Sequence, residues 1–312
     1  MHRRDFLKRS SFGAGALVLP VHLQPLFAHT ARVPACRNLI IVHLQGGNDG
    51  LNTVVPFSDD VYYRKRPKLA IQSRDVIRLN DAFGFNPACR SLMPAYDKGQ
   101  LLILNQAGGN MPASHYTACR TWEAGFCRMM AGTDFPDGAA YEAGVRSGGR
   151  MMEACDLGVC DETDFENRLL RISTATGGHA AAGIYKIALD GFDTHQFQRL
   201  KQDRLLTVYA NGISALIHKL SLAGQFDQTL ILTYSEFGRA VAENAKHGTE
   251  HGSAHPVFLF GGQLREAGIA DNLPCPESSV DHEIDLHTAL ASIRKNWLYE
   301  ASSTAPACTD RI

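Results

Sequence analysis

Acidic and imidazole side chains recur near the ends of apolar stretches of this sequence. They are Asp49 in "GGNDG", Asp193 and His195 in "GFDTH", Glu236 in "SEFGR" and His251 in "EHG". Carboxylate oxygens and imidazole nitrogens suit zinc, manganese, magnesium or calcium, and no thiolate stands among these residues. If the apolar stretches form neighbouring strands, the groups meet at one edge of a sheet. The pattern predicts a site for a divalent metal, whose identity stays open.

Several of these residues also have a structural explanation. Asp49 lies in a turn rich in asparagine and glycine, where an aspartate commonly bonds its own backbone. Asp193 and His195 lie two residues apart, so an extended chain points both at one ion, but the carboxylate also suits a partner that orients the imidazole. Glu236 has Arg239 three residues later as a candidate ion-pair partner.

The segment "NMPASHY" supplies candidates for chemistry beside a metal. Ser114 precedes a stretch that could open a helix, so its usual role is that of an N-cap. The same place suits a nucleophile, because a metal and the helix dipole stabilise the alkoxide. His115 is a metal ligand, a general acid or a partner of the cap. We predict catalytic roles for Ser114 and His115.

In "EHGSAH" we favour His251 as the ligand and leave His255 a supporting or structural role.

Five apolar stretches predict buried strands, within residues 38–44, 99–109, 181–193, 228–238 and 255–262. Apolar residues spaced three and four apart in "QRLKQDRLLTVYANGISALIHKLSLAG", with Gly224 at the end, predict a long amphipathic helix. Strand-helix-strand units predict an α/β fold with a mostly parallel sheet flanked by helices on both faces. Residues 125–183 are rich in glycine with little periodicity, and we predict a loop-rich insertion within a single domain of residues 31–312.

Residues 1–30 have the pattern of a twin-arginine signal peptide. Arg3 and Arg4 precede an apolar run too short and too glycine-rich to span a bilayer well, and cleavage is expected near Ala28 or Ala31. The alternative is a basic amphipathic helix. We expect a periplasmic or secreted protein, carried by the twin-arginine translocase and left with no stable membrane span after cleavage.

Charge and cysteine content restrict the remaining classes. The net charge is -1 and the pI is near 6.9. Domains that bind nucleic acid commonly have a pI above about 9, so we expect no nucleic-acid partner. Eight cysteines are an even set for an oxidising compartment, and the nearest pairs for disulfides are Cys119 with Cys127 and Cys155 with Cys160. Their spacings match no zinc finger or ribbon.

Together, "GGNDGLNTVVP", "SHY", "GFDTHQFQ", "SEFGR" and "GTEHGSAHPVFLFGG" resemble the bacterial domain of unknown function 1501 family. That family is grouped with the alkaline phosphatase and sulfatase superfamily, and the resemblance covers the leader, residues 38–125 and residues 183 to the end. It implies an alkaline-phosphatase-like fold and a metal-dependent hydrolase of small anionic phosphate or sulfate esters. By position, Asp49 resembles the ligand after the first strand, and Ser114 lies near the expected nucleophile.

The sequence departs from the superfamily pattern at three places. Asp193 and His195 are two residues apart instead of four, Glu236 replaces an Asp-His pair, and the middle of the chain is short. These departures also admit a non-catalytic metal-binding or ligand-binding protein of the same fold. For an enzyme, Arg239 or Arg120 are the candidates to hold the substrate oxyanion.

Overall fold

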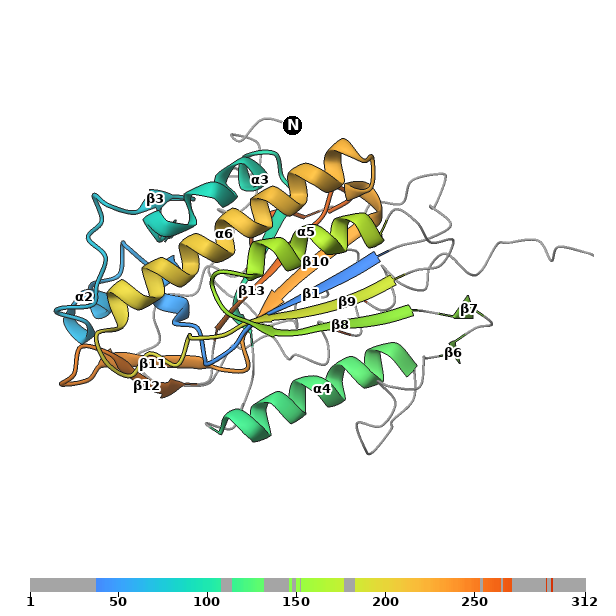
Figure 1. The fold of residues 1–312 in the computed structure, drawn as a ribbon. Coiled ribbons are helices and arrows are strands. Elements are labelled where there is room, and N and C mark those ends of the chain that lie inside the picture. Colours follow the sequence, from blue (N-terminus) through green and yellow to red (C-terminus); the bar gives the residue numbers. More distant parts are fainter. Residues whose placement is uncertain are drawn as a thin grey trace, which may run out of the picture.

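The computed structural model describes residues 38–107, 114–131, 146–147, 150–151, 153–176, 183–252, 255–264, 266–270, 290 and 293. Among these residues the main sheet has seven strands, in the order β14-β5-β13-β10-β1-β9-β8 (Figure 1). The strands are β1 (Asn38–Leu44), β5 (Leu101–Ala107), β8 (Glu153–Cys160), β9 (Gly183–Leu189), β10 (Thr229–Tyr234), β13 (His255–Phe260) and β14 (Gly268–Ile269).

The described sheet is mostly parallel, as predicted. β1 pairs in parallel with β9 and β10, β8 with β9, and β14 with β5. β13 runs antiparallel to both of its neighbours, β10 and β5, so it departs from the parallel direction within a sheet that is otherwise parallel among the described strands. The connection from β10 to β13 holds β11 (Gly238–Glu243) and β12 (Thr249–Gly252) in place of a crossover helix, and a parallel return needs such a crossover.

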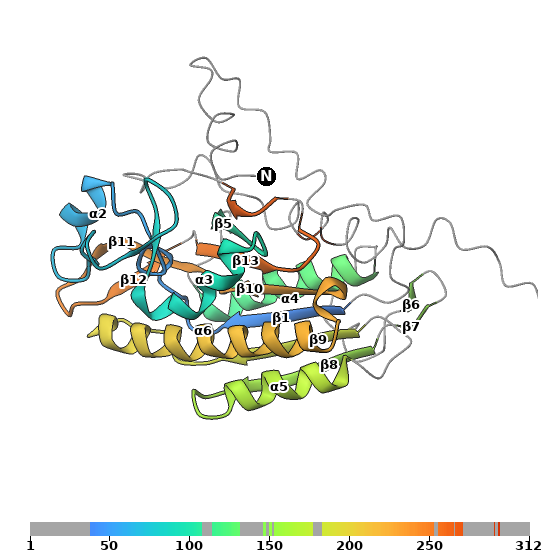
Figure 2. The ribbon, with the colours of Figure 1, turned by 90° about the horizontal axis from the view of Figure 1, so that it is seen from above.

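Helices cover both faces of the main sheet (Figures 1 and 2). The α-helices are α2 (Asp60–Lys65), α3 (Met93–Asp97), α4 (His115–Ala131), α5 (Phe165–Ala175) and α6 (Gln198–Leu222). Short 3-10 helices span Gly50–Asn52, Pro87–Leu92 and Phe226–Gln228, and the minor strands are β2 (Val54–Val55), β3 (Ile77–Arg78), β4 (Gly84–Phe85), β6 (Arg146–Ser147) and β7 (Arg150–Met151). α3, α5 and α6 pack on one face of the sheet, and α4 packs on the other.

The apolar run of β1 is explained by this two-sided cover. Side chains alternate across a strand, so Ile40, Val42 and Leu44 pack in the core beneath α5 and α6, while Leu39 and Ile41 pack in the core beneath α4. A strand buried on both faces has no polar side, which is why its sequence shows a continuous run and no alternation.

The long amphipathic helix is confirmed as α6. Ile213, Leu216 and Leu220 are fully buried against the sheet. Gly224 follows the helix with a positive φ of 67°, a left-handed conformation in which glycine ends helices without strain from a side chain.

Residues 153–176, which lie within the predicted loop-rich insertion, form a strand and a helix. β8 is an edge strand of the main sheet, and α5 packs Phe165, Leu169 and Ile172 into the same core as α6. The buried residues of α5 recur at spacings of four and three, but eleven residues carry a weaker periodic signal than the 25 of α6.

Cys89, Cys119, Cys155 and Cys160 have free thiols. The pairing of Cys155 with Cys160 is therefore not found, and Cys119 has no disulfide. The predicted signal peptide lies outside the described residues. Among the described helices, none combines the length and the hydropathy that a membrane crossing requires.

Candidate metal centre

The carboxyl ends of β1, β9 and β10 lie side by side, because these strands are parallel neighbours. The loop after β1 packs closely on the loop after β9. Gly46 has a φ of 117°, and a Cβ at this position would overlap the backbone of Phe192 and Asp193. Only glycine allows this approach. The residues after β9 and β10 therefore share one edge of the sheet with the loop after β1.

Asp193 is the centre of a cluster of three imidazoles. Its Oδ1 lies 3.0 Å from Nε2 of His195 and 3.4 Å from Nε2 of His251, and its Oδ2 lies 3.7 Å from Nε2 of His115. The Nε2 atoms of His195 and His251 are 3.0 Å apart. We refer to Asp193, His195, His251 and His115 as the Asp193 cluster. The sequence placed three of these residues among its predicted ligands, and for His115 it offered the roles of ligand, general acid and partner of the cap.

Two imidazoles of the cluster contact a carboxylate through Nδ1, the ring nitrogen that does not face Asp193. Nδ1 of His115 lies 2.8 Å from Oε1 of Glu236, and Nδ1 of His195 lies 3.3 Å from Oε2 of Glu250. Metal-binding histidines commonly bond a carboxylate through the nitrogen that does not bind the metal, which fixes the tautomer and the direction of the ring. Both rings therefore direct Nε2 toward Asp193.

The guanidinium of Arg239 keeps the Asp193 carboxylate charged. Its Nη2 donates to Oδ1 of Asp193 at 2.7 Å. Partial burial raises the pKa of Asp193, but the hydrogen bond and the charge of Arg239 outweigh this effect and hold the pKa below its usual value. Arg239 also donates to the backbone carbonyls of Gly46, Gly47 and Phe192, and its side chain is fully buried. These contacts make Arg239 a scaffold for Asp193. The sequence had offered it as a partner for Glu236 or for a substrate oxyanion.

The donor atoms of the cluster fit a divalent cation. Ligand atoms of His115, Asp193 and His251 all lie within 4.8 Å of one another, and His195 adds a further imidazole. Imidazole and carboxylate donors suit zinc or manganese better than calcium, which prefers oxygen alone. The side chain of Asp193 is 48% exposed, so an ion can reach it from solvent.

A hairpin of two short strands holds one side of the cluster. β11 and β12 pair so that Arg239 lies opposite His251. The turn between these strands packs on the segment after β9: Phe197 and Gln198 donate backbone N–H groups to the carbonyls of Lys246 and His247. A Cβ at Gly248 would overlap the carbonyl of His195, so this packing requires glycine at position 248.

Glu236 lies beneath the cluster as a buried anchor. Its Oε2 lies 2.9 Å from Nε2 of His43, and its Oε1 accepts from the backbone N–H of Gly46 at 2.8 Å. Burial raises the pKa of Glu236, but the hydrogen bonds with His43 and His115 and the charge of His43 outweigh it and lower the pKa to about 2. Glu236 therefore stays ionised, with its two oxygens facing different histidines.

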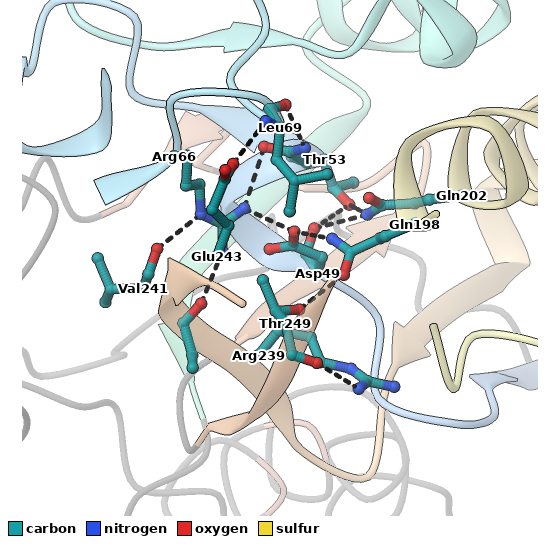
Figure 3. Close-up of polar contacts among 12 residues, drawn as sticks. Asp49, Thr53, Arg66, Leu69, Gln198, Gln202, Arg239, Val241, Glu243 and Thr249 are labelled. Carbon is teal, nitrogen blue, oxygen red and sulfur yellow. Dashed lines mark hydrogen bonds and ion pairs between the residues drawn. The ribbon is translucent and has the colours of Figure 1, made fainter. Parts of the chain in front are cut away.

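Asp49 belongs to a neighbouring network, which reaches Arg239 through Gln198 and Thr249 (Figure 3). Arg66 donates Nη1 to Oδ2 of Asp49 at 2.6 Å, and Nε2 of Gln198 donates to the same oxygen. Gln202 donates to the backbone carbonyl of Asp49. Arg66 uses its other donors on the carbonyls of Ala240 and Val241 and on Asn52. The structure does not bring Asp49 together with the Asp193 cluster, and its buried ion pair gives the carboxylate a structural role.

Ser114 lies exposed directly before the first turn of α4. Its carbonyl accepts from the backbone N–H of Ala118, which is the geometry of a residue that opens a helix. The next residue is His115 of the cluster, so Ser114 adjoins the cluster along the chain. Cys119 lies one turn further along α4, and burial, followed by the charges of Glu236 and Glu123, raises the pKa of its thiol to about 11.

Sequence reasoning missed three residues that contact predicted site residues: His43 contacts Glu236, Glu250 contacts His195 and Arg66 contacts Asp49. His43 is an imidazole near the end of an otherwise apolar strand, and a buried imidazole needs a partner, which is a signal that the sequence did contain. Glu250 stands next to His251 and could have been found as an orienting carboxylate. Arg66 lies in "RKRPKLA" among several cations, where nothing distinguishes the one that becomes buried.

Residues 159–293 match the model of a family described as "Protein of unknown function (DUF1501)". No curated protein matches the chain. The match covers less than half of the sequence, and it contains Asp193, His195, Glu236 and His251.

Solved structures resemble the fold at low sequence identity. Murine ectonucleotide pyrophosphatase/phosphodiesterase 5, an inactive form with AMP, aligns at a TM-score of 0.47 and 10% identity, over 84% of this chain and 95% of that one. Ps i-CgsB, with k-i-k-neocarrahexaose, aligns at 0.46 and 11%, over 82% and 72%. The periplasmic domain of EcEptC from Escherichia coli, in complex with Zn, aligns at 0.44 and 9%, over 85% and 84%.

At these TM-scores and identities, the likeness assigns no chemistry to this chain. The evidence from sequence is more direct, because the matched region contains the motifs "GFDTHQFQ", "SEFGR" and "GTEHG" from which the resemblance was inferred. The predicted resemblance to the domain of unknown function 1501 family is confirmed by the match over residues 159–293.

Proposed function

We propose that this chain is an exported, metal-dependent hydrolase of phosphate or sulfate esters. One observation carries the proposal: three imidazoles present Nε2 to the Asp193 carboxylate, and two of them are held in that direction by carboxylates on Nδ1. A purely structural aspartate needs no such set of oriented donors. Export is supported by the twin-arginine pattern of residues 1–30.

Asp193, His195, His251 and His115 are the proposed ligands of the ion. When bound, a divalent ion would act as a Lewis acid that draws charge from an ester oxyanion. Glu236 and Glu250 keep His115 and His195 in position. Arg239 keeps Asp193 ionised and is too enclosed to meet the substrate itself. Arg120 lies exposed on α4 and remains the predicted cationic contact for the oxyanion.

Ser114 is the proposed nucleophile. Its Oγ forms a bond to phosphorus or sulfur, the bond to the ester oxygen breaks, and the proton that the Ser114 hydroxyl gives up balances the one that the departing alkoxide takes up to leave as an alcohol. Water then hydrolyses the seryl ester, which releases phosphate or sulfate and restores the hydroxyl. The position at the start of α4 supports this role, because backbone N–H groups at a helix start stabilise anions.

The test is elemental analysis of the purified protein, combined with assays on aryl phosphates and aryl sulfates with zinc, manganese, magnesium or calcium. We expect His251→Ala to lose bound metal and activity, and Ser114→Ala to keep the metal but lose turnover. The control is His218→Ala, which removes an exposed imidazole of α6 outside the cluster. Protein that binds none of these ions overturns the proposal, and a fully active Ser114→Ala variant assigns the attack to water.

A second candidate function is a metal-binding or ligand-binding protein without turnover. It is favoured by Asp49, because the carboxylate that the resemblance implied as a ligand pairs with Arg66. The ligand set is thus smaller than the resemblance implies. Bound metal with no activity on either ester class supports this candidate, and measurable hydrolysis that depends on Ser114 rejects it.

A further inference from the structure

A second group of metal-ligand types lies beside the Asp193 cluster and is more deeply buried. It comprises His43 of β1, Cys119 of α4 and Glu236, which follows β10. One ligand atom from each residue lies within 4.8 Å of the others. The side chains of His43 and Glu236 are 7% and 0% exposed, and Cys119 is half-buried. Three elements far apart in the sequence therefore place nitrogen, sulfur and oxygen donors at one point.

Neighbouring aromatic rings fix the positions of these donors. The imidazole of His43 stacks on Tyr234, with centroids 4.6 Å apart and planes 5° apart. Trp122 packs on the same tyrosine at 4.1 Å and donates Nε1 to the backbone carbonyl of Glu236 at 3.2 Å. Trp122 and Cys119 are three residues apart, so they lie on the same side of α4. The arrangement is held by packing and does not need an ion to assemble it.

We propose that His43, Cys119 and Glu236 form a separate binding site for zinc or a similar borderline ion. A thiolate selects zinc and cobalt over magnesium and calcium, and an imidazole with a carboxylate completes a donor set common in zinc sites. The metal ligands predicted from the sequence contained no sulfur. This inference does not rest on ester hydrolysis.

Glu236 separates the two sites and belongs to both environments. Its Oε1 holds His115 of the Asp193 cluster, and its Oε2 faces His43. An ion at His43 takes the place of the hydrogen bond between the imidazole and Oε2, while the bond to His115 stays. Burial of two of the three ligands leaves little room for a substrate. An ion at this site therefore connects the first half of α4 to β1 and to the end of β10. Because His115 is the first residue of α4, the ion also helps to fix its position.

The experiment is a cobalt titration of full-length protein after removal of metals by a chelator. Cobalt bound to a thiolate gives a charge-transfer absorption band in the near ultraviolet. We expect this band in the natural protein and in His251→Ala, which removes a ligand of the other cluster only. We expect its loss in Cys119→Ser. Cys155→Ser, which removes an exposed free thiol on β8, is the matched control and keeps the band.

A second measurement needs no substitution. Zinc is expected to slow alkylation of Cys119 in the natural protein by about tenfold or more, because a metal-bound thiolate is a poor nucleophile, and to leave Cys155 unchanged. Mass spectrometry of the alkylated peptides gives both rates. No charge-transfer band in the natural protein, a band that survives Cys119→Ser, or alkylation of Cys119 at the same rate with zinc overturns the site. Loss of esterase activity alone bears only on the Asp193 cluster.

Discussion

Asp49 and Asp193 both follow strands of the main sheet, and their surroundings differ. The Asp49 side chain is 0% exposed and shares Oδ2 between Arg66 and Gln198. Asp193 is 48% exposed and faces three imidazoles as well as Arg239. An aspartate enclosed by a fixed cation and an amide holds the fold together. An aspartate that faces oriented nitrogen donors near solvent can exchange those contacts for an ion.

The largest expected effect is on stability, through Asp49. We predict that Asp49→Ala lowers the free energy of unfolding by about 3–5 kcal/mol, because it leaves the buried charge of Arg66 unpaired. Urea unfolding measures this, and elemental analysis of the folded fraction should show unchanged metal. Asp59→Asn is the control, because Asp59 caps α2 at a partly exposed position. A stable Asp49→Ala protein that has lost its metal would show that Asp49 is a ligand. Asp49 and Asp193 would then have the same role.

Acid is expected to weaken the anchor beneath the Asp193 cluster. The pKa of Glu236 is lowered from its usual 4.5 to about 2 in the folded protein. A lowered pKa stabilises the fold above the unfolded value, and this stability is lost as pH falls from about 4.5 toward 2. The loss is on the order of 2–3 kcal/mol. Unfolding measured across this range should show a steeper pH dependence in the natural protein than in Glu236→Gln. An equal pH dependence of the free energy of unfolding in the two proteins would show that ionised Glu236 does not stabilise the fold.

Packing between the hairpin and His195 gives an intermediate effect. Gly248→Ala should cost about 1–3 kcal/mol, because its Cβ overlaps the His195 carbonyl and moves that segment. It should also weaken metal binding, measured by calorimetry. Gly224→Ala is the matched control: it strains a left-handed glycine at the end of α6, with nothing within 4 Å of the added carbon. Metal affinity that falls equally in both variants would mean that the hairpin does not position His195.

The smallest effect should come from Glu250. Glu250→Gln weakens the hold on Nδ1 of His195, and we expect metal affinity to fall by about tenfold with little change in stability. Glu162→Gln, which breaks an ion pair with Arg204 on the other side of α6, should leave affinity unchanged. An unchanged metal affinity in Glu250→Gln would show that the contact between Glu250 and His195 does not orient the imidazole for metal binding.

The fold was predictable where the pattern is long and local. Continuous apolar runs identified β1 and β10, and periodicity identified α6 with its glycine stop. The reversed direction of β13 was not predictable from its own residues, because strand direction depends on the connection that precedes it. β8 carries Glu153, Asp156 and Gly158 in place of a continuous apolar run, and the burial of β8 and α5 depends on β9 and α6.

The candidate site was predictable in part for the same reason. Asp193, His195 and His251 have ligand types at strand ends, and the structure brings them together. Asp49 has the same local appearance, but its partner Arg66 is chosen by tertiary packing. His43, Cys119 and Glu236 lie close together in the fold, although His43 and Glu236 are 193 positions apart in the sequence. No local spacing rule can predict such a contact.

The β11–β12 hairpin stands apart from the main sheet, yet its ladder pairs Arg239 with His251. A local opening of this hairpin would remove one imidazole and the cation beside Asp193 in a single event, while the seven-stranded sheet stays closed. The population of the assembled cluster would then be set by a local free energy of opening that global unfolding does not report. Amide hydrogen exchange along β11 and β12, compared with that of β1, measures it directly.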